Sequence, residues 1–178
     1  KGTFTTVRDV LDEISRDVLR FIMLTRRNDA SLDFDLAEVT AQTKENPVFY
    51  VQYAHARIHS VLRHAAKDMP ELPVADTNSI QLLNADEEIG LIKKLAEYPR
   101  IIEAAALHYE PHRLPYYLQE LAACFHQLWN AGKADSQLRF INQEDVTGTS
   151  ARIALITATA KVIASGLHVM GVEPVEQM

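Results

Sequence analysis

The sequence lacks the features of a disulfide-crosslinked fold and of a membrane-spanning fold. It has one cysteine and six glycines among 178 residues. A single cysteine excludes an internal disulfide framework and is in keeping with a reducing compartment. No apolar run reaches the roughly 18 residues that a bilayer-spanning helix needs, and the polar opening stretch does not have the pattern of a signal peptide. We therefore expect a cytoplasmic protein with no membrane partner.

Motifs that carry catalysis are also missing. There is no glycine-rich phosphate loop, no nucleophile elbow, and no Cys/His arrangement with a base. His55 and His59 have the spacing of a helical metal pair, but Ala56 stands where a zincin has its glutamate and no third ligand is evident. We therefore expect no catalytic residue and no metal site here. The sequence favours a helical binding module over an enzyme.

Negative charge is absent from parts of a chain that is acidic overall. The formal net charge is −6, but residues 46–67 and 150–172 hold no Asp or Glu, and Glu120 is the only acid in residues 111–133. If these segments pack side by side, one face of the protein is basic or neutral. Such a protein would bind a polyanion at one directed surface and not indiscriminately.

Helical spacing of apolar residues dominates the chain, and alternating strand patterns are nearly absent. Capping residues and prolines predict helices at residues 7–14, 17–26, 36–44, 47–66, 86–98, 99–109, 115–130 and 150–169. Pro99 is expected to form a hinge because it cannot supply a backbone donor, and Ser150 is expected to cap the last helix. Residues 67–79 read as a linker and 131–149 as a long loop. The predicted fold class is an all-α helical bundle.

The helix expected at 47–66 carries aromatic rings beside cations. Its apolar stripe predicts the core face: Val51, Ala54, Ile58, Val61, Leu62 and Ala65. Tyr50, Tyr53 and Arg57 fall within a sector of roughly 60° at the edge of this stripe. Tyrosines at such a boundary often only pack their rings and leave their hydroxyls in water. The alternative is a ligand-facing edge, where rings stack on flat groups and Arg57 meets a phosphate or a base edge.

The helix expected at 115–130 repeats this theme. Phe125 and Trp129 lie one turn apart on its apolar stripe. A lone tryptophan in a helical stripe is usually a core residue, so the stripe alone does not establish a binding role.

Several stretches resemble one known family. "ENPVFYVQYAHARIHSVLR" closely resembles the helix that opens the anticodon-binding domain of arginyl-tRNA synthetases, which is of the DALR type. "GTFTTVRDVLDEISRDVLRFIMLTRRNDASLDFDLAEV" is similar to the segment after that family's signature loop. "YYLQELAACFHQLWN" and "GLHVMGVEPVEQM" are similar to a later helix and to the C-terminal tail. The resemblance implies stem-contact or junction helices at residues 1–45, following a catalytic domain, and a helical anticodon-binding domain at 46–178.

The resemblance also implies a function. The full-length enzymes ligate arginine to tRNA-Arg using ATP with Mg. This chain, which opens on Lys1 without an initiator methionine, is expected to be a fragment that holds the anticodon stem-loop and lacks the catalytic site. We expect no cofactor in the fragment, tRNA-Arg and not DNA as the partner, and a monomeric parent protein.

The family's anticodon pocket is lined from the first helix, the later aromatic helix and the C-terminus. Carried over, this points to a base pocket of Tyr50, Tyr53, Arg57, Phe125, Trp129 and Met178. Relatives can have a tyrosine at the position of Phe125, and Pro174 comes one position earlier than the family pattern. The cations expected to contact the RNA backbone are Arg63, Lys67, Arg113 and Lys161. Every arginine anticodon has a central C, which rings can sandwich and an arginine can read.

Two other interpretations stay open. One is a protein-interaction bundle without an RNA role, whose aromatic edge meets a partner helix. The other is the related anticodon domain of cysteinyl-tRNA synthetase or of the glycyl enzyme's β subunit, which the Tyr-Ala-His-Ala-Arg run at 53–57 disfavours.

Overall fold

The computed structural model describes residues 6–27, 29–31, 35, 39–41, 43 and 46–178. Within these residues the regular structure is helical and no strand occurs, which confirms the predicted all-α class. The elements are α1 (Val7–Glu13), α2 (Arg16–Leu24), α4 (Pro47–Asp68), α5 (Thr77–Ile80), α6 (Asp86–Leu107), α7 (Arg113–Ala134), the 3-10 helix η1 (Ser136–Leu138) and α8 (Val146–Val169). The helix predicted at 36–44 lies largely outside the described residues.

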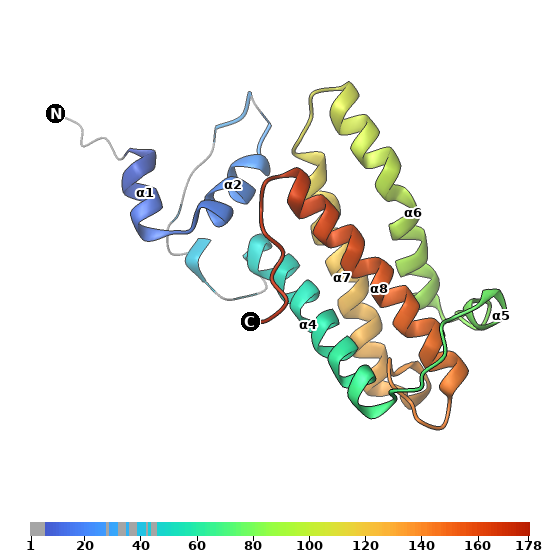
Figure 1. Ribbon diagram of the computed structural model, residues 1–178. Helices are drawn as coiled ribbons and strands as arrows, with labels where there is room; N and C mark the ends of the chain where they lie inside the picture. The colour runs from blue at the N-terminus through green and yellow to red at the C-terminus, as the bar shows by residue number, and fades with distance from the viewer. Residues whose placement is uncertain (1–5, 28, 32–34, 36–38, 42, 44–45) are drawn as a thin grey trace.

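The four long helices form a bundle. α4 and α7 run in one direction and α6 and α8 in the other (Figure 1). α8 packs against α4, α5, α6 and α7, so it contacts all three of the other long helices. Its length and mean hydropathy of 1.2 would also suit a membrane span, but 56% of its most apolar window is buried inside the protein. A helix that is apolar on most sides is expected at the centre of a bundle.

Two predicted helix starts are confirmed in atomic detail. The Thr6 hydroxyl accepts a hydrogen bond from the Asp9 backbone N–H, and the Asp9 carboxylate accepts one from the Thr6 N–H at 2.7 Å. This is the reciprocal capping box that the sequence indicates. Asn46 accepts from the N–H groups of Val48 and Phe49, with Pro47 at the first helical position. These signals fix where α4, the helix of the candidate site, begins.

Three predicted boundaries are wrong. α6 continues through Pro99 as one helix. Pro99 is exposed, and the packing of α6 on α7 along its length outweighs the single hydrogen bond that proline removes. α7 begins at Arg113, two residues before Pro115. α8 begins at Val146, where Asp145 caps the Gly148 N–H.

Ser150 is therefore not a cap but an interior residue of α8. It is 3% exposed, and its hydroxyl donates to the Pro73 carbonyl at 2.7 Å. A buried ion pair fixes the same end of the bundle. Arg152 Nε on α8 donates to Glu88 Oε1 on α6 at 2.7 Å, with both side chains less than 10% exposed. Glu88 also accepts from the Ala85 N–H at the start of α6.

Candidate functional site

The neighbouring helices α4 and α7 bring three of the predicted residues together. The Arg57 guanidinium carbon lies 4.2 Å from the centroid of the Tyr53 ring, one turn earlier on α4. It lies 4.6 Å from the centroid of the Trp129 ring, on α7. One guanidinium nitrogen also donates to the Tyr53 hydroxyl. A cation held over two aromatic rings is a favourable arrangement that fixes the arginine in place.

This arrangement differs in one respect from the sandwich that the sequence suggests. The guanidinium itself covers a face of each ring, so those faces do not form an open slot for a base. Arg57 also lines the cavity described below, so a base that enters the site can meet the N–H groups of its guanidinium. Arg57 is therefore the central residue of the site, and the rings position it.

A residue that the sequence analysis missed, His126, lies behind Arg57. Its Nδ1 is 3.5 Å from an Arg57 nitrogen, and its ring packs on those of Tyr50 and Tyr53 at 4.8 and 5.8 Å between centroids. Burial and then the neighbouring Arg57 charge lower the pKa of His126 to about 4. Because arginine can only donate, a neutral His126 accepts from it at Nδ1. His126 is one turn before Trp129, and that spacing was the available signal.

An open cavity of about 470 Å³ lies in front of these residues. Its lining includes four residues predicted from the sequence, Tyr53, Arg57, Trp129 and Met178, and it also takes in Arg63, which was predicted only as a backbone contact. His64 and Gln177 were not predicted. His64 is seven residues after Arg57 and so lies on the same helix face. The cavity has the size of a small-ligand site.

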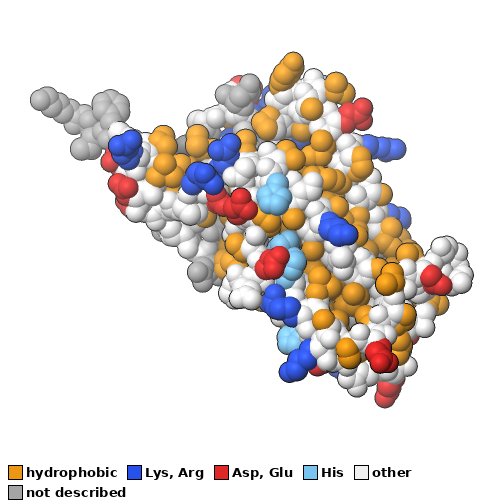
Figure 2. Space-filling model, viewed as in Figure 1, with side chains coloured by type: hydrophobic (Ala, Val, Ile, Leu, Met, Phe, Trp, Pro, Cys, Tyr) orange, Lys and Arg blue, Asp and Glu red, His pale blue; other side chains and the backbone are white. Residues whose placement is uncertain are grey.

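The C-terminal segment, residues 171–178, closes one side of this cavity. Gly171, with a φ of 68°, turns the chain back so that the segment runs along α4 (Figure 1). His55 Nδ1 donates to the Val175 carbonyl at 2.7 Å, and Arg63 donates to the Glu176 carbonyl at 3.3 Å. These bonds bring Met178 to the middle of α4. Figure 2 shows histidine, basic and acidic side chains together where the segment meets this helix.

Two residues predicted for the pocket lie behind it. Phe125 has no exposed surface and stacks on Phe140 at 5.8 Å, so it supports Trp129 from inside the core. Tyr50 is half-buried and packs on His126. Periodicity places both residues on the correct helix edges but cannot tell which ring reaches the surface.

The predicted backbone contacts are dispersed. Lys67 is exposed in the last turn of α4, and Lys161 is exposed on α8. Arg113 starts α7 and pairs with Glu110, sixteen residues before Trp129, which is about 24 Å along a helix. Among the described residues, no group of three His, Cys, Asp or Glu side chains converges on a point that could hold a metal ion.

Comparisons with known proteins identify the relatives of this chain. Residues 51–178 match the family described as DALR anticodon binding domain. An arginine–tRNA ligase of Rhodospirillum rubrum is 54% identical over 99% of this chain and 31% of its own length. One of Parvibaculum lavamentivorans is 52% identical with the same coverage. The chain thus spans about a third of these relatives.

Solved structures show the same likeness. The arginyl-tRNA synthetase of Thermus thermophilus superposes with a TM-score of 0.76 at 28% identity, over 91% of this chain and 26% of that one. A Campylobacter jejuni protein described as an arginyl-tRNA synthetase superposes with a TM-score of 0.83 at 30% identity, over 99% of this chain and 36% of that one.

Proposed function

The chain belongs to the DALR anticodon-binding domain family, and from that premise we propose that it is the anticodon-binding part of an arginine–tRNA ligase. The relatives with that name, which it matches over 99% of its length, support this. The longer protein would ligate arginine to tRNA-Arg in the cytoplasm, acting as a monomer. We assign its ATP and Mg to the rest of the longer protein, since this chain spans about a third of the length of its relatives.

One observation carries the proposal: Arg57 lies over Tyr53 and Trp129 at the wall of an open cavity. An unpaired base is recognised by flat groups that stack on its face and by donors or acceptors that meet its pairing edge. The N–H groups of a guanidinium can serve as donors to the pairing edge. The rings and His126 hold the guanidinium in one orientation. Its fixed orientation lowers the conformational entropy lost on binding.

The chemistry of the donors favours cytosine. Cytosine presents two neighbouring acceptors, O2 and N3, on its pairing edge, whereas uracil has an N–H donor at N3. Arginine carries five N–H donors and no acceptor. Arg57 can therefore donate to both N3 and O2 of cytosine, whereas at N3 of uracil it meets another N–H donor and loses that hydrogen bond. All arginine anticodons have a central C, which this site would read. Arg63, Lys67, His64 and Lys161 would contact phosphates and add affinity without sequence information.

Binding of an anticodon-hairpin RNA tests the proposal. Wild-type protein should bind a hairpin with a central C more tightly than one with a central U. Arg57→Ala should weaken binding of the C hairpin roughly 5- to 150-fold, the range of 1–3 kcal/mol for one base contact, and should abolish the preference for C. Fluorescence anisotropy titrations measure both.

Arg100→Ala is the matched control, because Arg100 is exposed on α6 outside the cavity. This variant should leave the affinity for the central-C hairpin and the preference for C over U unchanged. Equal binding of both hairpins by wild-type protein would contradict the proposal. If the protein does not bind RNA but associates with a protein partner, and salt does not weaken that association, the chain is a protein-interaction module instead. A preference for hairpins without a central C would point to another synthetase.

A further inference from the structure

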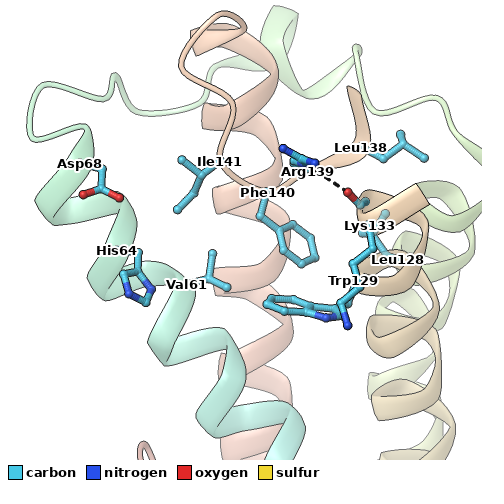
Figure 3. A pocket seen from close by; sticks show the side chains of 11 residues that line it. Val61, His64, Asp68, Leu128, Trp129, Lys133, Leu138, Arg139, Phe140 and Ile141 are labelled. Carbon is cyan, nitrogen blue, oxygen red and sulfur yellow. Dashed lines mark hydrogen bonds between the residues drawn. The ribbon is translucent and has the colours of Figure 1, made fainter. Parts of the chain in front are cut away.

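A second cavity adjoins the first. It has a volume of about 520 Å³, and three residues line both cavities: Val61, His64 and Trp129. Figure 3 shows the indole of Trp129 between the α4 side, with Val61 and His64, and the end of α7. The tryptophan that contacts Arg57 in the first cavity is thus also a wall of the second.

The second cavity has an aromatic and aliphatic interior. The Phe140 ring lies 6.0 Å from that of Trp129, and Leu128, Leu138 and Ile141 add aliphatic surface. Gly132 permits this shape, because a Cβ there would come within 2.8 Å of the Leu138 carbonyl oxygen. The chain from Leu138 to Ile141 can therefore close over the end of α7.

The rim of this cavity is mostly basic. Lys133 and Arg139 are exposed on the α7 side, and His64 is exposed on α4. Lys133 Nζ lies 5.9 Å from the Trp129 ring, and Arg139 Nε donates to the Gly132 carbonyl at 3.4 Å. The one acid in the lining, Asp68, lies on the opposite, α4 side. An anion at the α7 side therefore meets two cations and is far from the carboxylate.

We infer that the second cavity binds another unpaired base of the same RNA loop, next in the strand to the base at Arg57. This inference rests on the proposed function. An apolar aromatic interior suits the face of a base, and Lys133 and Arg139 suit the phosphate that links the two nucleotides. Asp68 can accept a hydrogen bond from an exocyclic amino group. Two consecutive bases would then lie on either side of Trp129.

Abasic nucleotides in the hairpin test this inference. An abasic residue removes one base and keeps its phosphate, so each position flanking the central C is replaced in turn. With the 178-residue chain, one of these two replacements should weaken binding roughly 5- to 150-fold, the range for one stacked base. Ile141→Trp, which fills the cavity from its half-buried wall, should weaken the intact hairpin similarly and abolish the effect of that abasic position.

A second pair of variants keeps the test independent of folding. Lys133→Gln with Arg139→Gln removes the rim charge at exposed positions, and Lys93→Gln with Arg100→Gln removes the same charge from the exposed face of α6. The double substitution at the rim, at Lys133 and Arg139, should weaken RNA binding at least fivefold more than the double substitution on α6. Thermal melts of all variants should stay close to the wild-type melt.

The outcomes separate this inference from the proposed function. If the central-C preference and its loss in Arg57→Ala are found, but neither flanking base matters and Ile141→Trp binds like wild type, the second-base site is wrong and the proposed function stands. If wild-type protein shows no preference for a central C, the proposed function itself fails.

Discussion

At the scale of single residues, the site depends on a neutral histidine. Arg57 is held by Tyr53, Trp129 and His126, and only the uncharged form of His126 can accept a hydrogen bond from it. Burial and the Arg57 charge both oppose protonation, which explains the pKa of about 4. The burial of His126 and its hydrogen bond with Arg57 therefore both require the neutral form of the histidine.

This lowered pKa makes stability depend on pH. An unfolded histidine has a pKa of about 6.5, so between pH 6.5 and about 4 the unfolded chain binds more protons at His126 than the folded chain. Stability is thus full above pH 6.5 and is lost as pH falls through this window. Between pH 7 and pH 5 the free energy of unfolding of the wild type should fall by about 2 kcal/mol more than that of His126→Gln.

Urea denaturation of both proteins at the two pH values measures this difference. Burial also lowers the pKa of His55, although its hydrogen bond to Val175 opposes the shift. That residue is present in both proteins, so its effect cancels. Identical losses of stability in the two proteins would show that His126 is not held neutral.

At the scale of elements, the C-terminal segment completes the site only because α8 ends in a sharp reversal. The Gly171 N–H donates to the His168 carbonyl at 2.9 Å and the Val172 N–H to the Leu167 carbonyl at 3.0 Å. Such a helix end needs one residue in the left-handed backbone conformation, which glycine adopts without steric cost. The bonds from His55 and Arg63 then hold the segment on α4.

Gly171→Ala should therefore weaken both stability and RNA binding. A side chain at a φ of 68° costs about 1–2 kcal/mol, and its Cβ would lie 2.7 Å from Arg20 Nε, which donates to the Met170 carbonyl. The displaced segment would also move Met178. Urea denaturation and hairpin titration give the two readouts.

Gly90→Ala is the matched control on α6. Nothing lies within 4 Å of a Cβ built there, so alanine should raise stability by about 0.5–1 kcal/mol through its helix preference and leave RNA binding unchanged. If Gly171→Ala is as stable as wild type and binds RNA equally well, the turn does not hold the segment in place.

At the scale of the whole molecule, the chain is acidic overall, but the lining of the Arg57 cavity has two arginines and no Asp or Glu side chain. α4 and α8, which hold the two acid-free segments, pack together, which meets the condition that the sequence analysis set for a basic or neutral face. Repulsion from the net charge of −6 should keep RNA away from the rest of the surface. Contacts between the cations and phosphates should make the binding strongly dependent on salt.

Salt titrations of charge variants test where the phosphates lie. Each phosphate contact to a single strand contributes about 0.7 to the slope of log K against log salt. Lys67→Gln should reduce the slope by about that amount. Arg113→Gln should leave it unchanged, because Arg113 pairs with Glu110 at the far end of α7. Equal reductions would place RNA along the whole of α7.

Local sequence patterns are enough to predict the all-α class, the start of α4 and the shared helix face of Tyr53 and Arg57. These follow from short-range physics: Asn46 and Pro47 act within one turn, and Tyr53 and Arg57 share a face because of helical period. The wrong boundaries have the same origin, since Pro99 and Ser150 signal an end or a cap locally but are overruled by packing on α7 and by a bond to Pro73.

Only the tertiary structure decided which rings reach the surface. Phe125 and Trp129 lie one turn apart on the same stripe, and Phe140, from the loop after η1, packs on both rings. Phe125 has no exposed surface, whereas Trp129 is only half-buried. His126 likewise becomes a partner of Arg57 only when α7 packs on α4. Such contacts depend on side chains far apart in the chain, and no local periodicity encodes their distances.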